Sequence, residues 1–249
     1  FSLSLIGTFL VRSGILTSVH AFAVDAARGV FILAMIVVAT GGALALFAWR
    51  APAMRSGAMF GAVSREGGLT INNLFLMAAT ATVFLGTFYP VIIDGLTGDK
   101  ISVGPPYYNA VFVPIMVPLL LLVSIGSMLN WKRDTVKAAL TRLRWPAAIA
   151  LAVLVAGIAI AGIGNALAAL GLALGVWLIV GAAWVLVRRR HVLRTTPRAL
   201  IAMAIAHAGL GVTVCGITAM AAWSSSTVAT MAPGETISAG PDRVRLDWL

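Results

Sequence analysis

The chain has 249 residues, of which 60% are hydrophobic and only 10% are charged, and its mean hydropathy is +1.00. This composition excludes an ordinary soluble domain, in which about a quarter of the residues are charged, and it indicates a membrane protein. The net charge of +10 does not predict a nucleic-acid partner, because the basic residues gather in alternate loops between apolar runs.

The chain begins with an apolar stretch, residues 1–11, that is too short to cross a bilayer and that we interpret as the last turns of a helix. Because the sequence starts at Phe1 without a basic segment or cleavage site, we interpret it as a fragment and not as a signal peptide. Six later runs are long enough to cross roughly 30 Å of hydrocarbon as helices. These predicted spans cover residues 29–49, 69–93, 110–129, 146–163, 167–187 and 199–222.

Lysine and arginine predict which way the spans run. The loops 50–65, 130–145 and 188–198 hold 13 of the 18 basic residues. Basic loops stay preferentially on the cytoplasmic side of a membrane. We therefore expect loops 12–28 and 94–109, together with the C-terminal tail, to lie in the periplasm. Glycine and proline make loop 94–109 rich in turns, which predicts a non-helical connection.

Composition changes after the last predicted span. Residues 1–222 form the predicted transmembrane helical domain, whereas residues 223–249 are polar and contain a predicted turn at 232–235. Short strand patterns follow at 236–237 and 244–246. We therefore expect an all-α, polytopic transmembrane bundle of six full spans plus the end of another helix. The start of a truncated, β-rich periplasmic domain would follow it.

His207 is the one side chain within the six predicted spans that titrates near neutral pH. Its position, eight residues into the last span, predicts a depth of roughly 12 Å. Ala204, Gly209 and Gly211 suggest a flat slot in which a neutral imidazole ligates a porphyrin iron. Two alternatives remain open: the small residues allow close helix packing while His207 makes a hydrogen bond, or His207 belongs to a proton relay.

His20 is a second candidate ligand, in the loop predicted to lie outside the membrane. Ile15, Val19 and Phe22 form an apolar face at helical spacing, which would place His20 near the headgroups. The alternative is an interfacial histidine without a ligand. Arg12, at the outer end of the first helix, either pairs with an anionic group such as a propionate or extends to lipid phosphates.

Other polar residues suggest less specific roles. Cys215 is the only cysteine, so the chain has no CxxC pair and any thiol chemistry must come from another protein. Asn72 and Asn73 are expected to make hydrogen bonds between helices. A polar pocket for a quinol, formed by these amides with Glu66, is the weaker alternative.

Several motifs carry a resemblance to a known family. The segment GTFLVRSGILTSVHAFA, at residues 7–23, is similar to the outer-face histidine motif of the CcmF-type cytochrome c haem lyases and their NrfE-type relatives. The other similar motifs are REGG at 65–68 with Asn72 and Asn73, KISVGPPY at 100–107, AHAG at 206–209 and MAPG at 231–234. Together these motifs cover nearly the whole chain in order.

The resemblance implies two haem sites. In this family, an outer pair of histidines receives haem from the chaperone CcmE, and an intramembrane pair binds a resident haem b. By resemblance, His20 is one of the outer pair and His207 is one of the membrane pair, each as a ligand of iron. The resemblance also implies that the haem vinyl groups are joined to the two thiols of a CxxCH motif on apocytochrome c. CcmH-type partners would present these thiols, and the resident haem b would reduce the incoming iron.

The chain lacks the tryptophan-rich periplasmic segment and the other two histidines of the family, which we expect upstream of Phe1. We therefore expect a subunit of a haem lyase in the bacterial inner membrane that is not competent as this piece alone, with no catalytic residue identified. A haem exporter or other membrane transporter is the alternative. The absence of carboxylates from the predicted spans argues against ion-coupled transport, and a purely structural scaffold would hold no cofactor.

Overall fold

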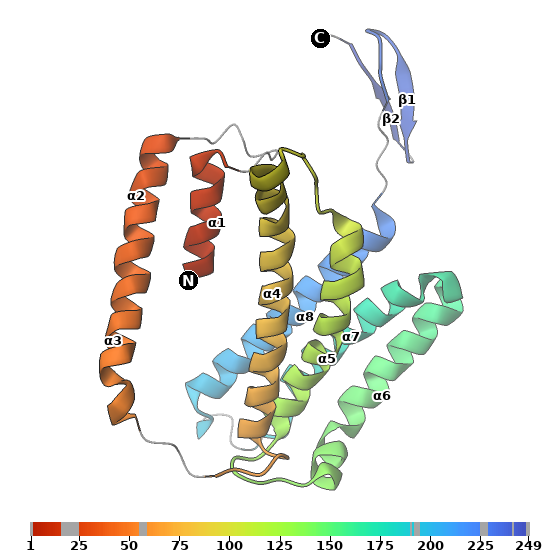
Figure 1. Cartoon of the computed structure of the whole chain (residues 1–249). Helices are drawn as coiled ribbons and strands as arrows, with labels where there is room; N and C mark the ends of the chain where they lie inside the picture. The colour runs from red at the N-terminus through yellow and green to blue at the C-terminus, as the bar shows by residue number, and fades with distance from the viewer. Residues whose placement is uncertain are drawn as a thin grey trace. The chain divides into compact units, whose positions relative to one another are not determined.

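The computed structural model describes residues 2–15, 25–54, 59–189, 191, 195–224, 229–240 and 242–247. Long helices form most of it, and a β-hairpin follows the last of them (Figure 1). The first elements are α1 (Ser2–Ser13), α2 (Ala26–Ile36), the π-helical turn η2 (Val37–Gly41), α3 (Gly42–Arg50) and η3 (Ala51–Ala53). The later ones are α4 (Arg65–Thr97), α5 (Pro105–Met128), α6 (Val136–Ala161), η4 (Ile163–Asn165), α7 (Ala166–Val187), α8 (Arg198–Trp223), β1 (Thr236–Ala239) and β2 (Asp242–Arg245).

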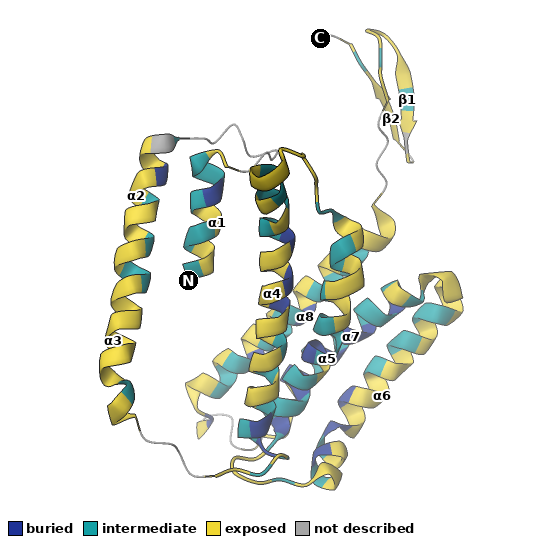
Figure 2. Ribbon diagram, viewed as in Figure 1, coloured by how far each residue is buried: buried dark blue, intermediate teal, exposed yellow. Residues whose placement is uncertain are grey.

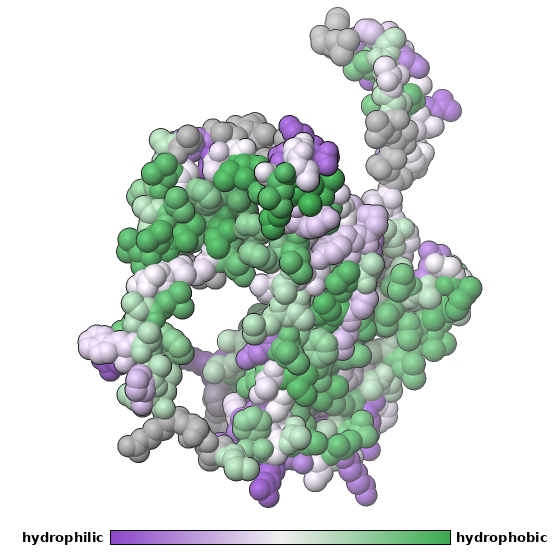
Figure 3. All heavy atoms as spheres, in the orientation of Figure 1, coloured by the Kyte–Doolittle hydropathy of each residue, from purple (hydrophilic) through white to green (hydrophobic). Residues whose placement is uncertain are grey.

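The chain has six helices that are long and apolar enough to cross a membrane, counted within the described residues. The predicted number of spans and the all-α class are therefore confirmed. The helical run from α2 through α3 forms the first of these spans, and α4 to α8 form the other five. Figure 3 shows apolar residues over most of the visible helix surfaces, as expected for helices that face lipid.

Several helix ends differ from the prediction. α6 begins at Val136, ten residues before the predicted start, because the side chain of Thr135 caps it by accepting a hydrogen bond from the amide of Ala138. α4 continues to Thr97 and α5 begins at Pro105, so the non-helical loop predicted at 94–109 is shorter at both ends. Proline is favourable in the first turn of a helix, where its missing N–H leaves no hydrogen bond unmade.

Two compact units divide the described chain. Unit 1 comprises Phe1–Met59 and Thr80–Phe112, and unit 2 comprises Phe60–Ala79 and Val113–Leu249. Within unit 1, α1 packs beside α2, and the hydroxyl of Thr40 donates to the hydroxyl of Ser2 over 2.9 Å.

The core of unit 2 gathers around α7. This helix is apolar on all sides, and Leu178 near its middle is fully enclosed. The indole of Trp177 donates to the carbonyl of Leu121 over 3.2 Å, and the hydroxyl of Ser124 donates to the carbonyl of Trp177 over 3.3 Å. These bonds join α7 to α5. In Figure 2 the buried residues concentrate on α5 and α7, whereas α3 is almost entirely exposed.

The C-terminal hairpin confirms the predicted strand pattern. β1 and β2 pair antiparallel, with Thr236 opposite Arg245 and Ala239 opposite Asp242. The predicted turn before it is present, because the amide of Glu235 donates to the carbonyl of Ala232 over 3.0 Å. Gly234 supplies the positive φ of 89° that this turn requires.

Candidate functional site

His207 lies near the middle of α8 with its imidazole half-buried. The ring has no hydrogen-bond partner in the part of the chain that the structure describes. A neutral imidazole of this kind keeps a nitrogen lone pair that can bind iron. This position therefore fits an axial ligand, and it gives no support to the alternative in which His207 is tied to a neighbouring helix.

The small residues around His207 have a different role from the predicted slot. Ala204 is only 3% exposed, and a Cβ atom added at Gly211 would lie 2.6 Å from the carbonyl oxygen of Gly175 on α7. Gly211 therefore serves close packing between α8 and α7, which is the alternative considered from the sequence, and Ala204 is buried. Gly209 faces open space and lies two residues from His207, which is about 200° around the helix.

Arg65 reaches the same face of α8 as His207. Its guanidinium Nη2 donates to the sulfur of Met203 over 3.2 Å, and it lies 5.1 Å from the ring centroid of Trp131. Met203 precedes His207 by four residues, which places the two side chains on one face. Unit 2 therefore brings a cation close to the candidate iron ligand.

A tight junction holds Arg65 in this place. The amide of Arg65 donates to the carbonyl of Asn130 over 2.9 Å, and the amide of Gly61 donates to the carbonyl of Lys132 over 2.8 Å. The hydroxyl of Ser64, which is fully buried, accepts from the amide of Gly67 over 3.0 Å. We call this arrangement the 60–68 junction. It anchors the first turn of α4 to the segment between α5 and α6.

The prediction from sequence missed Arg65, because the span was predicted to begin at residue 69 and Arg65 was assigned to a loop. Ser64 followed by Glu66 was the available signal, since a serine cap and an acid in the first turn mark a helix start. The contact with Met203 has no local signal, because 138 residues separate the two in the chain.

Glu66 and the two neighbouring asparagines do not form the polar group considered from the sequence. Glu66 accepts a hydrogen bond from the amide of Lys132 over 2.7 Å and pairs with the Lys132 ammonium over 3.4 Å. Asn72 is half-buried and Asn73 is exposed. Neither amide makes a side-chain hydrogen bond within the described ranges, so the expected bonds between helices are not observed.

Arg12 and the loop that carries His20 belong to unit 1. His20 lies outside the described residues, so its proposed role remains a prediction. The amide of Asp25 donates to the carbonyl of Arg12 over 2.9 Å, which brings together the two flanks of this loop. Arg12 is half-buried near the end of α1.

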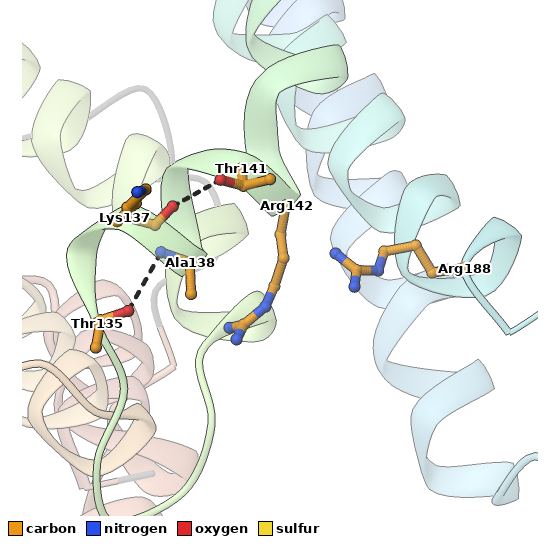
Figure 4. Close-up of a pocket in the computed structure, with 6 residues that line it drawn as sticks. All are labelled: Thr135, Lys137, Ala138, Thr141, Arg142 and Arg188. Atoms are coloured by element: carbon orange, nitrogen blue, oxygen red, sulfur yellow. Dashed lines mark hydrogen bonds between the residues drawn. The ribbon is translucent and has the colours of Figure 1, made fainter.

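A basic cavity lies at the end of unit 2 where α6 begins (Figure 4). Its volume is about 440 Å³, and its lining comprises Thr135, Lys137, Ala138, Thr141, Arg142 and Arg188. Figure 4 shows the side chain of Arg188 directed toward that of Arg142. Arg142 also pairs with Asp134, through Nη2 and Oδ1 at 3.2 Å. None of these described lining residues is a histidine, and the cavity is a different feature from the face that carries His207.

Comparisons with known proteins place the chain in a family. No family model and no solved structure matches it. It is 49% identical over its whole length to the cytochrome c-type biogenesis protein CycK of Rhizobium meliloti, of which it spans 38%. Over 96% of its length it is 44% identical to the cytochrome c-type biogenesis protein CcmF of Pseudomonas aeruginosa, of which it spans 37%. The chain therefore belongs to the CcmF/CycK family of cytochrome c-type biogenesis proteins.

Proposed function

We propose that this chain is part of a cytochrome c haem lyase of the bacterial inner membrane, and that His207 is one axial ligand of a resident haem b. Membership of a cytochrome c-type biogenesis family supports a role in cytochrome c maturation. The observation that carries the haem assignment is the half-buried imidazole of His207, which has no hydrogen-bond partner among the described residues and lies near the middle of a helix long enough to span the membrane. Intramembrane ionisable groups are costly, so they are usually kept for function.

The chain contributes position and charge to this reaction. When bound, the resident haem would supply the electron that reduces the iron of the incoming haem, and the incoming haem would supply the two vinyl groups to which the thiols of a CxxCH motif add. Packing of α8 on α7 through Gly175 and Gly211 holds the backbone that carries His207. The neutral imidazole of His207 would hold the iron of this resident haem. The second axial ligand would come from a part of the protein outside this chain.

Unit 1 would serve the haem that arrives as substrate at the periplasmic face. His20 would ligate its iron, and Arg12 would pair with one of its propionates. The backbone bond between Asp25 and Arg12 closes the loop that carries His20, which would limit the positions open to that histidine. We propose CcmE as the haem donor, a CcmH-type protein as the partner that presents reduced thiols, and apocytochrome c as the acceptor.

The distribution of basic residues supports a periplasmic C-terminal tail. Arg65, Lys132, Arg142 and Arg188 belong to one end of unit 2, and the loops at that end would face the cytoplasm. The hairpin β1–β2 follows the opposite end of α8. We therefore propose that the hairpin begins the periplasmic part, where apocytochrome c is available.

The proposal is tested on the full-length protein purified in detergent. We expect a Soret band from bound haem, and we expect the His207→Ala variant to lose the band of the resident haem. The matched control is His191→Ala, which changes a histidine outside the membrane spans and should leave the spectrum unchanged. An unchanged spectrum in His207→Ala would falsify the assignment. Haem movement across vesicles without a covalent cytochrome product would favour the exporter.

A further inference from the structure

The guanidinium of Arg65 lies along the face of α8 that carries His207. Its contact with Met203 is one helical turn, or about 6 Å along the axis, from the position of His207. Arg65, Met203 and His207 all belong to unit 2. A single ligand of moderate size can therefore contact both the imidazole and the guanidinium.

The present partners of Arg65 are weak ones for a cation. A thioether sulfur is a poor hydrogen-bond acceptor, and an aromatic ring offers only a cation–π contact. Among the described residues, no carboxylate pairs with Arg65. The two carboxylates at this end of unit 2 have other partners, since Glu66 pairs with Lys132 and Asp134 pairs with Arg142. The guanidinium of Arg65 therefore has N–H groups that no carboxylate occupies, and their planar arrangement suits a bidentate hydrogen bond to a carboxylate.

The 60–68 junction makes this placement reproducible. A Cβ atom added at Gly67 would collide with the carbonyl oxygen of Ala62, so the chain can pass this point only with glycine. Ser64 is enclosed with 0% exposure while it caps the first turn. Because the backbone of Arg65 is hydrogen-bonded to Asn130, its side chain starts from a fixed point. These contacts give the REGG motif a physical purpose, which is to present one guanidinium to α8.

We propose that Arg65 binds a carboxylate of the ligand that His207 holds, which is a propionate of a porphyrin. The inference rests on the proposed function, because it takes His207 as an iron ligand. A porphyrin has an apolar ring and anionic side chains, so its ring suits the interior of the span and its propionates suit the end where α4 begins. Arg65 would exchange the sulfur of Met203 for the carboxylate, with a gain in hydrogen-bond strength.

This role predicts two measurable effects of removing the charge. Arg65→Gln loses a charge-assisted bond to the ligand, so the haem content per protein should fall several-fold in dilute detergent. In the haem that remains, an uncompensated propionate favours the more positive ferric iron. The midpoint potential of the resident haem should therefore shift to lower values. Arg65→Lys keeps the charge but loses the bidentate geometry, so it should restore most of the potential and only part of the retention.

The experiment compares four variants of the full-length protein by haem content and by redox titration. Arg65→Gln and Arg65→Lys test the charge. Glu66→Gln breaks the pair with Lys132 while it leaves Arg65 intact, so it reports the effect of a loosened junction. The loss of its negative charge would by itself raise the potential, in the direction opposite to that expected for Arg65→Gln. Lys137→Gln removes an exposed cation from α6 and controls for net charge. We expect the lowered potential in Arg65→Gln only.

The outcomes separate this inference from the proposed function. If His207→Ala loses its haem while Arg65→Gln keeps both haem content and potential, the carboxylate contact is wrong and the iron ligand stands. If His207→Ala keeps its haem, both proposals fail. If Glu66→Gln lowers the potential as much as Arg65→Gln does, the effect belongs to the fold of the junction, and the inference is again wrong. Should Arg65→Gln fail to accumulate, Arg65→Lys decides. We expect it to keep most of the wild-type potential while it retains less haem than the wild type, and full haem retention in Arg65→Lys would make the inference wrong.

Discussion

Helix α7 and the helical run from α2 through α3 are similarly apolar, but the rest of the chain buries them to very different extents. Within their most apolar windows, 44% of the residues of the span that contains α7 are buried, against 0% for the run through α2 and α3. Apolar composition therefore indicates only that a helix enters the bilayer, because lipid tails and protein side chains are equally apolar. Burial depends on small residues and on a few polar contacts, such as those of Gly175 and Trp177.

The largest expected effect comes from truncating the centre of α7. Leu178→Ala leaves a cavity at a fully enclosed position and should lower the free energy of unfolding by about 2–5 kcal/mol. Leu44→Ala, at a position 63% exposed on α3, should change it by less than about 0.5 kcal/mol. Thermal melting of both full-length variants in the same detergent measures the difference. Equal losses would mean that α3 is covered as well as α7 is.

A smaller effect is expected from adding one methyl group between α7 and α8. Gly211→Ala would place a Cβ atom against the backbone of Gly175, and overpacking of this kind costs about 1–3 kcal/mol. Gly216→Ala on the same helix meets nothing within 4 Å, so it should be neutral or slightly stabilising. Melting temperatures of the two variants test this contrast. A stable Gly211→Ala protein would show that the two helices separate easily.

The same difference between a buried and an exposed region is found for two ion pairs near helix starts, one in each unit. Asp134 is 3% exposed beside Arg142, whereas Asp25 is 34% exposed beside Arg28. Exposed pairs contribute little, because water and salt screen them. The hydrogen bond from Arg142, with further bonds from the amides of Asn130 and Thr135, lowers the pKa of Asp134 from 3.8 to about 2.

This shift has a defined consequence in acid. The folded state favours the ionised form of Asp134, so its contribution to stability is complete above pH 3.8 and is lost as the pH falls toward about 2. Asp134→Asn should be less stable at neutral pH, and its stability should depend less on pH in that window. Melting curves between pH 2 and pH 6 would measure both effects. If the melting temperature of the wild type fell with pH no more steeply than that of Asp134→Asn, the stabilising role of ionised Asp134 would be contradicted.

Much of the fold follows from the sequence alone. Six apolar runs of about 20 residues predict six spans without knowledge of any contact, because the hydrocarbon thickness sets the length of a spanning helix. The start of α6 was predicted ten residues late, because Pro146 and the basic residues before it resemble a loop. In the structure Lys137, Arg142 and Arg144 lie within the first three turns of α6, where long side chains can extend toward the membrane surface.

The candidate site was only partly predictable. His207 is conspicuous in the sequence, because it is a titratable residue within an apolar run. The purpose of Ala204 and Gly211 was not decided by the sequence, since small residues serve both ligand slots and helix packing. The structure assigns Gly211 to the contact with α7 and shows that Ala204 is buried.

The sequence by itself determined the number of spans, the position of His207 within one of them, and the family motifs. Each of these depends on local composition or on an ordered string of residues, which a linear chain displays directly. The tertiary structure alone decided that Arg65 meets Met203 beside His207, and that α7 is the central helix of unit 2. The physical reason is that a helix apolar on all sides has no periodic signal for its buried face, so only contacts between distant segments define its neighbours.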